Sequence, residues 1–253
     1  EDGLVKAGFV INEKANSIFE VHKAANAKAF VKPQGFDAMF HPYIPPQVVY
    51  SAAQMDEIVA GSDIGIITIG RNSGEGGDRK EKDDFLLSKQ EQDMIALTCK
   101  TYHQAGKKVV VVLNIGGVIE TESWKAQPDA ILLAWQGGQE GGNSVADILS
   151  GKVSPSGKLP VTFPVNVNDH ASNKNFPQEG VPMKLTDMLF AKEVAEKDRV
   201  RNTDYTAYEE GIYVGYRHFD KAKLKVSYPF GFGLSYTGFE YGNMNAVAVN
   251  DTI

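Results

Sequence analysis

Residues 107–116 read KKVVVVLNIG, in which five apolar residues follow one another from Val109 to Leu113. A second apolar run, DIGIITIG, spans 63–70, and a third, AILLAW, spans 130–135. A strand with one solvated face alternates apolar and polar residues, whereas a strand covered on both faces is apolar throughout. The three runs therefore predict buried, parallel strands of one sheet.

Helical segments separate these runs. Ser51 and Ser88 each precede a Gln or Glu by three residues, a spacing that is the signature of a capping box at a helix N-terminus. Strand and helix alternate with short connections, which is typical of an α/β fold with a largely parallel sheet between helices. The expected helices span 52–60, 88–104, 120–126 and 143–149.

The chain changes character after the last of these helices, because prolines and glycines interrupt every apolar period. The stretches 208–219 and 228–241 are rich in aromatic residues and glycine, and they predict strands and tight turns against the body. Residues 183–201 fit either an amphipathic helix or an excursion over the surface. We assign residues 1–241 to one α/β domain, and 242–253 to a linker or to the start of a further β domain.

The aromatic residues of the second half need their own interpretation, since exposed rings can stack on sugars. Aromatic residues at this density more often build a core or a domain seam. We therefore interpret as packing the residues Tyr213, Tyr216, Phe219, Tyr228, Phe230, Phe232 and Tyr236.

The bulk composition excludes several classes of protein. With 253 residues, 42% of them hydrophobic, the chain can bury a full core, and a net charge of -6 does not suit a nucleic-acid partner. No apolar run approaches the roughly 20 residues that cross a bilayer, and the N-terminus lacks the pattern of a signal peptide, so we expect a soluble chain. The single cysteine, Cys99, forms no internal disulfide and is expected to be an inert, packed thiol.

The segment RNSGEGGDR, residues 71–79, follows the first predicted strand directly. Open α/β sheets place their ligand sites at the carboxyl ends of their strands. Glu75 lies between Gly74 and Gly76, and a carboxylate on such backbone can reach outward toward a ligand. The alternative is a solvated turn with mixed charges, which is our interpretation of the neighbouring run 79–84.

Other kinds of site have little support. The five histidines, at positions 22, 41, 103, 170 and 218, form no short-spaced pair and have no cysteine partners, so we predict no metal site. Residues 137–142, GGQEGG, do not fit GxGxxG, and no phosphate-binding loop or GxSxG nucleophile elbow is present. We therefore expect no cofactor, and we assign these glycines to close packing between helix and strand.

Several segments, taken in order, resemble one known family. SGEGGDR is followed by AILLAWQGGQEGG, PSGKLPVTFP, EGIYVGYRHF and YPFGFGLSYTGFEY. This ordered set is similar to the C-terminal α/β sandwich domain of family 3 glycoside hydrolases, which are β-glucosidase-like enzymes of carbohydrate metabolism. The resemblance covers roughly residues 53–241.

The resemblance implies a divided catalytic site. In that family a preceding (β/α)8 barrel carries an aspartate nucleophile, and a loop of the sandwich brings the acid/base glutamate, which Glu75 matches. One subgroup uses a His-Asp pair on the barrel instead. The chain would thus be the C-terminal domain of a retaining β-glycosidase, a β-glucosidase foremost, that hydrolyses terminal β-D-glycosidic bonds. A barrel needs about 250 residues of its own, so we expect the nucleophile outside this chain.

The residues around Glu75 receive supporting roles from the same resemblance. Arg71, Asp78 and Arg79 would fix the loop, or seat it against the barrel, through charged hydrogen bonds. The alternative is that they are surface charges with little energetic effect. Ser73 could contact the sugar, but stabilisation of the turn is the preferred interpretation.

The family also implies partners for the chain. These are a β-glucoside or related oligosaccharide, the N-terminal barrel, and a fibronectin III-like domain that would begin in residues 242–253. The family's sandwich usually starts with an earlier strand than this chain does, and the missing part could be a separate chain, a cleaved piece or an omitted region. The family also implies a secreted or periplasmic location. The alternative function is a noncatalytic carbohydrate-binding or assembly module with the same fold. The identity of the sugar and of the linkage stays open.

Overall fold

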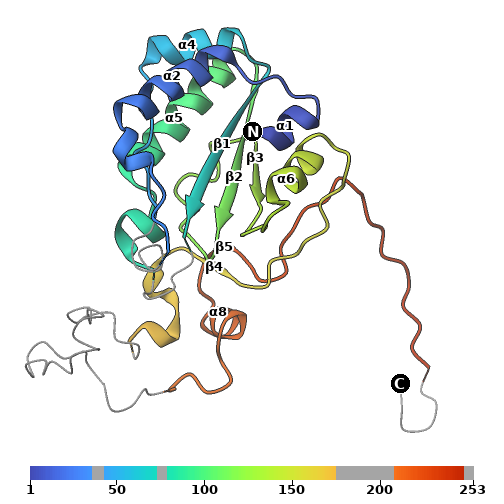
Figure 1. Cartoon of the computed structure of the whole chain (residues 1–253). Helices are drawn as coiled ribbons and strands as arrows, with labels where there is room; N and C mark the ends of the chain where they lie inside the picture. The colour runs from blue at the N-terminus through green and yellow to red at the C-terminus, as the bar shows by residue number, and fades with distance from the viewer. Residues whose placement is uncertain (36–42, 73–78, 175–207, 248–253) are drawn as a thin grey trace, which may run out of the picture.

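The computed structural model describes residues 1–35, 43–72, 79–174 and 208–247. At its centre β2 (Lys108–Ile115) lies between β1 (Ile64–Arg71) and β3 (Ala130–Leu133), and both pairs are parallel (Figure 1). All five residues from Val109 to Leu113 are buried, because β2 has a neighbour on each edge and cover on each face. The predicted parallel sheet is confirmed. Its third strand ends before Trp135, whose φ of 50° turns the chain out of the sheet.

Two groups of helices cover this sheet. Figure 1 shows α2 (Glu13–Ala25), α4 (Ala52–Ala60) and α5 (Lys89–Gln104) together on one side, and α1 (Asp2–Lys6) with α6 (Gly141–Leu149) on the other. The sheet therefore lies between helices, as the sequence predicts. Its main core, between the sheet and α4 and α5, includes Met55, Val59, Ile67, Ile69, Ile95, Cys99, Tyr102, Val109, Val111, Leu113 and Ile115. Shorter helical turns are η1 (Ala27–Phe30), η2 (Glu81–Phe85), η3 (Val167–Asp169) and η4 (Ala171–Lys174).

Both predicted capping boxes form. The backbone N–H of Ser51 donates to Gln54 Oε1 at 2.9 Å, and the N–H of Ser88 donates to Glu91 Oε2 at 2.8 Å. In each case the serine hydroxyl accepts from the N–H of the residue three positions on. These reciprocal bonds satisfy donors that the first turn of a helix otherwise leaves unpaired. They fix where α4 and α5 begin.

Cys99 is packed in the core, as predicted. It lies on the buried side of α5 and is 4% exposed. Burial, together with the nearby charge of Asp129, raises the pKa of its thiol to about 11. Because the thiolate is the reactive species, this thiol is inert at neutral pH.

Close backbone contacts occur around the glycines at 137–142. A Cβ on Gly137 would lie 2.9 Å from the Cα of Gly141, and Gly138 has a φ of 63°. A Cβ on Gly3 of α1 would overlap the carbonyl oxygen of Gly142. The predicted packing of helix against strand is therefore wrong: the close contacts join Gly137 to the start of α6, and α6 to α1, whereas a Cβ on Gly138, Gly141 or Gly142 would meet open space.

The helix predicted at 120–126 is wrong, since this segment is a series of turns. The carboxylate of Glu120 accepts from the N–H and the hydroxyl of Ser123, both at 2.7 Å. The indole N–H of Trp124 donates to the Glu120 carbonyl at 2.8 Å. These side-chain bonds stabilise a tight turn in place of a continuous helix.

The tight turns predicted at 208–219 form at 209–212, but the predicted strands do not, because α8 (Tyr216–Ala222) occupies the end of this stretch. In 228–241 only Tyr228 belongs to a strand, so the strands predicted there are wrong as well. Gly215, with a φ of 56°, provides the turn that precedes α8, and its carbonyl accepts from the N–H of His218 at 3.0 Å. A short strand, β5 (Val226–Tyr228), does follow, and it pairs antiparallel with β4 (Phe163–Pro164).

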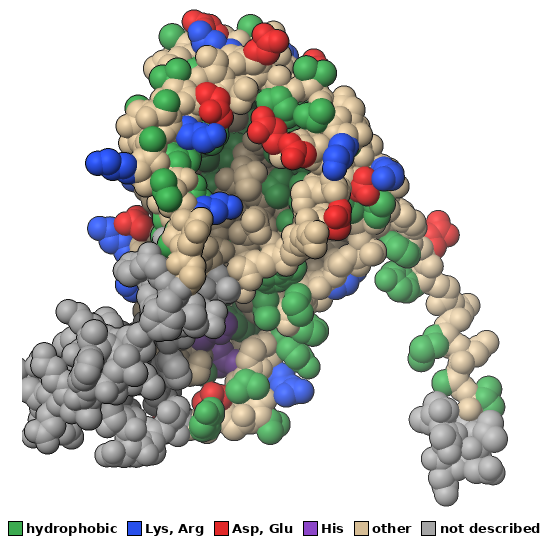
Figure 2. Space-filling view, viewed as in Figure 1, with side chains coloured by type: hydrophobic (Ala, Val, Ile, Leu, Met, Phe, Trp, Pro, Cys, Tyr) green, Lys and Arg blue, Asp and Glu red, His purple; other side chains and the backbone are tan. Residues whose placement is uncertain are grey.

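The aromatic residues of this region divide into two groups. Phe219 is 3% exposed, and the ring of Tyr228 packs edge-on against a buried phenylalanine. By contrast Phe230 is 49% exposed and Tyr236 62% exposed. Apolar side chains stand on the surface of this region in Figure 2. The interpretation as a core therefore holds for the first group only, and the domain seam stays a prediction for the second.

Two predicted segments lie outside the described residues: 183–201 and the end of 242–253. Residues 242–247 are described and have no regular secondary structure. Within the described ranges, the helices are all too short or too polar to cross a bilayer.

Candidate active-site loop and its anchors

The segment singled out from the sequence leaves the sheet at its carboxyl edge. β1 ends at Arg71, which is paired in register with Ile115 at the end of β2. This edge is where open α/β sheets bind their ligands. Ser73, Glu75 and Asp78 lie outside the described residues, whereas Arg71 and Arg79, on either side of them, are described.

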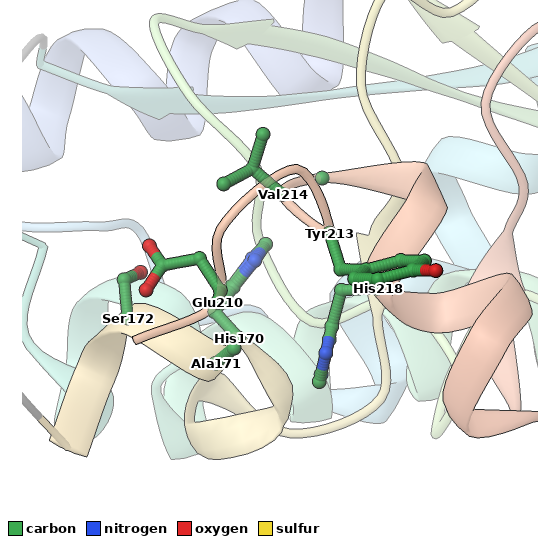
Figure 3. A pocket seen from close by; sticks show the side chains of 8 residues that line it. His170, Ala171, Ser172, Glu210, Tyr213, Val214 and His218 are labelled. Atoms are coloured by element: carbon green, nitrogen blue, oxygen red, sulfur yellow. The ribbon is translucent and has the colours of Figure 1, made fainter. Parts of the chain in front are cut away.

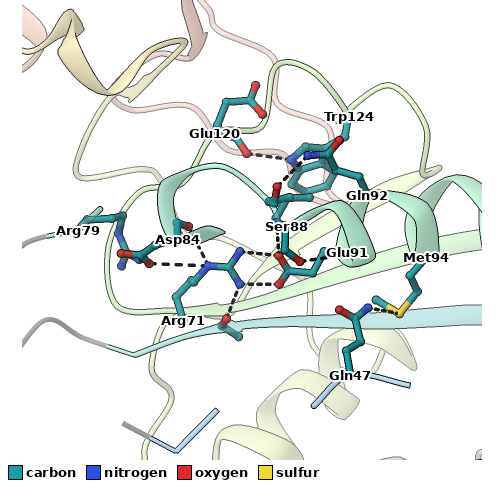
Figure 4. A network of polar contacts seen from close by, with 12 residues as sticks. Gln47, Arg71, Arg79, Asp84, Ser88, Glu91, Gln92, Met94, Glu120 and Trp124 are labelled. Carbon is teal, nitrogen blue, oxygen red and sulfur yellow. Dashed lines mark hydrogen bonds and ion pairs between the residues drawn. The ribbon is translucent and has the colours of Figure 1, made fainter. Parts of the chain in front are cut away.

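Arg71 is held by two neighbouring segments (Figure 4). Its Nη1 and Nη2 donate to the two carboxylate oxygens of Glu91 at 2.6 and 2.8 Å, and its Nε donates to the carbonyl of Asp84 at 2.8 Å. The side chains of Arg71 and Glu91 are 9% and 14% exposed. A two-pronged pair of this kind fixes both the position and the plane of the guanidinium group.

Glu91 also caps the N-terminus of α5. The same carboxylate that binds Arg71 accepts the N–H of Ser88 in the capping box. A negative charge in the first turn also interacts favourably with the helix dipole. The end of β1 is therefore tied to the N-terminus of α5.

Arg79 is anchored to the segment that follows it. Its Nη1 forms an ion pair with Oδ1 of Asp84, and its side chain is 17% exposed. The guanidinium group lies close to Gly117, where a Cβ would be 3.3 Å from Nη2. Asp84 also accepts the backbone N–H of Lys80 at 2.9 Å and lies 3.8 Å from Nε of Arg71.

The prediction that 79–84 is a solvated charged face is therefore wrong for its two ends. Asp84 has polar contacts with Arg71, Arg79 and Lys80, and its side chain is 32% exposed. Sequence reasoning missed Asp84 and Glu91 as members of this network. Their only signal was the presence of acidic residues after two arginines, which is common on solvated surfaces.

A small hollow lies beside α8 (Figure 3). Its volume is about 40 Å³, and its polar lining residues are His170, Ser172, Glu210, Tyr213 and His218. Burial lowers the pKa of His170, and so does the neighbouring His218. Pockets that hold organic ligands measure about 300–1,000 Å³. This cavity has room for water but not for a sugar, so it is no candidate for a substrate site.

Charged side chains of both signs lie on the surface of the described residues. On the face drawn in Figure 2, acidic and basic side chains are interspersed. Among the described residues, no group of three or more His, Cys, Asp or Glu has the arrangement of a metal site.

A parallel sheet between helices, with an anchored loop at its carboxyl edge, defines the class as an α/β sandwich domain. The family model for the glycosyl hydrolase family 3 C-terminal domain matches residues 9–216. The chain belongs to this family.

Three similar proteins are all named as beta-glucosidases. Beta-glucosidase A of Butyrivibrio fibrisolvens is 36% identical over 78% of this chain, and the beta-glucosidase of Ruminococcus albus is 32% identical over 94%. The structure of beta-glucosidase 3B from Thermotoga neapolitana in complex with glucose matches 96% of this chain with a TM-score of 0.77 and 37% identity.

The chain is much shorter than these relatives. It spans 24% of the Butyrivibrio enzyme, 22% of the Ruminococcus enzyme and 31% of the Thermotoga chain. The match therefore concerns their C-terminal domain, and the remainder of their length has no counterpart in this sequence.

Proposed function

We propose that this chain supplies the acid/base glutamate, Glu75, to a retaining β-glycosidase, most simply a β-glucosidase. The observation that carries the proposal is the place of the SGEG segment. It follows β1 at the ligand-binding edge of the sheet, between two arginines that are both anchored to the body. Membership of family 3 and the names of the relatives support the same assignment.

The proposed reaction needs two carboxyl groups about 5–5.5 Å apart. An aspartate of the N-terminal barrel attacks the anomeric carbon while Glu75 protonates the departing glycosidic oxygen. A covalent glycosyl-enzyme results. Glu75, now a carboxylate, then takes a proton from water, whose oxygen attacks the anomeric carbon and releases the aspartate.

Glu75 must be protonated for the first of these steps. Burial disfavours the charged form of a carboxyl group, and so does a second carboxylate nearby. Docking of the loop against the barrel would provide both, and so raise the pKa of Glu75 toward neutrality. The isolated domain lacks the nucleophile in this proposal, so it is inactive on its own.

The partners follow from the same proposal. They are a β-glucoside or related oligosaccharide, the barrel of the longer polypeptide, and a fibronectin III-like domain from residues 242–253 onward. The short span of the chain relative to its relatives supports the barrel partner. Action on such substrates would suit a secreted or periplasmic enzyme.

Replacement of Glu75 in the full-length enzyme tests the proposal. We expect Glu75→Gln to lower turnover of an unactivated alkyl β-glucoside by about 10²- to 10⁴-fold, the usual contribution of a general acid. A dinitrophenyl β-glucoside, whose leaving group needs little protonation, should lose much less in the step that forms the glycosyl-enzyme. Glu81→Gln is the matched control, since it removes the charge of an exposed glutamate on the same segment.

Unchanged turnover of the alkyl glucoside in Glu75→Gln would refute the acid/base role. If the unaltered full-length protein also hydrolysed no glycoside but bound oligosaccharide, the noncatalytic module would be the better interpretation.

A further inference from the structure

We propose that Asp84 is a positioning residue that fixes the two ends of the loop carrying Glu75 relative to each other. The inference rests on the proposed function of Glu75. The contacts that carry it, however, are all between described residues.

The two ends of the loop converge on Asp84. From the β1 end, Nε of Arg71 donates to its carbonyl at 2.8 Å and lies 3.8 Å from its Oδ1. From the other end, Arg79 pairs with Oδ1, and the N–H of Lys80 donates to Oδ2 at 2.9 Å. Figure 4 shows the Asp84 carboxylate between the two arginines. One residue therefore contacts both sides of the loop.

Asp84 itself is fixed to the core. The next residue, Phe85, is 2% exposed, and its carbonyl accepts the N–H of Glu120 at 2.8 Å. Its own N–H donates to the carbonyl of Lys80 at 2.8 Å, which closes the η2 turn. The carboxylate of Asp84 thus projects from backbone that cannot move without exposing Phe85.

The loop needs such an anchor because of its composition. Gly74, Gly76 and Gly77 flank the glutamate, and glycine has more backbone freedom to lose than any other residue. Catalytic groups lose rate steeply when they are displaced by as little as about 1 Å. Holding the two ends of a loop at a fixed separation restricts the positions available to the residue at its centre.

Glu91 divides this task with Asp84. Of the two arginines, it binds only Arg71, on the β1 side. Glu91→Gln therefore leaves the contacts of Arg79 in place. The carboxylate of Asp84 holds Arg79 and the N–H of Lys80 on the other side, so its replacement should free that side of the loop, while the main-chain bond from Arg71 persists.

The test uses the full-length enzyme with Asp84→Asn, which keeps the shape of the side chain and removes its charge. We expect kcat/KM for an alkyl β-glucoside, which reports formation of the glycosyl-enzyme, to fall about 10- to 100-fold, with a much smaller loss of kcat/KM for a dinitrophenyl β-glucoside. Asp84→Glu should recover part of the loss. Asp93→Asn, on the exposed side of α5, is the matched control. A thermal melt of each variant checks that it is folded.

A double variant separates positioning from a general structural role. If Asp84 acts through Glu75, adding Asp84→Asn to Glu75→Gln should cause no further loss, because interacting residues are not additive. Multiplicative losses, or equal losses of kcat/KM on the two glucosides, would overturn the inference. Normal turnover in Asp84→Asn beside an inactive Glu75→Gln would overturn it while leaving the proposed function intact, whereas an active Glu75→Gln would overturn both.

Discussion

The ion pair between Arg71 and Glu91 gives a sharp prediction about stability, through the variant Glu91→Gln. Glutamine retains the capping box, because it can accept the N–H of Ser88 as glutamate does. It removes the negative charge that faces Arg71, and it replaces the oxygen that accepts from Nη1 with an amide group that can only donate. Hydrogen bonds to charged groups contribute about 1.5–3 kcal/mol, and neutral ones about 0.5–1.5 kcal/mol. Of the two bonds from a guanidinium group that is 9% exposed, the one from Nη2 is therefore weakened and the one from Nη1 is lost.

We expect Glu91→Gln to lower the free energy of unfolding by about 3 kcal/mol, about 1 kcal/mol for the weakened bond and about 2 kcal/mol for the lost one. For a domain of this size that corresponds to a fall in Tm of about 6–12 °C. The Lys89–Asp93 pair on the same helix is the control, because its side chains are 79% and 61% exposed. Asp93→Asn should cost less than about 0.5 kcal/mol.

Urea unfolding, followed by the fluorescence of the two tryptophans, of which Trp124 is 1% exposed, measures both variants. Raising the salt concentration should abolish the small effect of Asp93→Asn and leave most of the effect of Glu91→Gln, since buried pairs are screened less. If Glu91→Gln cost no more than Asp93→Asn, the reasoning that the Arg71 pair anchors the end of β1 would be refuted.

Three further predictions concern other parts of the domain. Gly3→Ala should destabilise by about 1–3 kcal/mol through overpacking, whereas Gly141→Ala, with open space around it, should be neutral or stabilising; thermal melts compare them. The raised pKa of Cys99, about 11 against an ordinary 9.0, means that its stabilising contribution is complete below pH 9.0 and is lost toward pH 11. Thiol labelling at pH 8 should accordingly be slow until urea is added. Hydrogen bonds from Lys125 and a second lysine lower the pKa of Glu122 from 4.5 to about 2, so its contribution is present above pH 4.5 and lost toward pH 2. Glu122→Gln should flatten acid unfolding in that interval, and an unchanged acid curve would contradict this assignment.

The parts of the fold that follow local rules could be predicted from the sequence. Val109 to Leu113 had to be covered on both faces, and the serines at 51 and 88 set the starts of their helices. The turn at Glu120 could not be predicted, because it depends on the hydrogen bonds that its carboxylate accepts from the N–H and hydroxyl of Ser123.

The site shows the same division. Its position at the end of β1 follows from the apolar run before it. Its anchors, by contrast, are contacts between residues that lie far apart in the sequence. Arg71 reaches Asp84 13 residues on and Glu91 20 residues on. No period or motif relates residues at those separations, so only the folded chain identifies these acids as partners.

The contact between Gly3 and α6 has a consequence for how the domain is assembled during synthesis. β1, β2 and β3 join in the order in which they emerge, each beside its predecessor. α1 emerges before these strands, yet its partner α6 begins only at Gly141. At ribosomal rates of about 5–20 residues per second, α1 waits roughly 7 to 27 seconds for that surface. During this interval α1 is available to chaperones, and it docks only after all three strands of the central sheet have been synthesised.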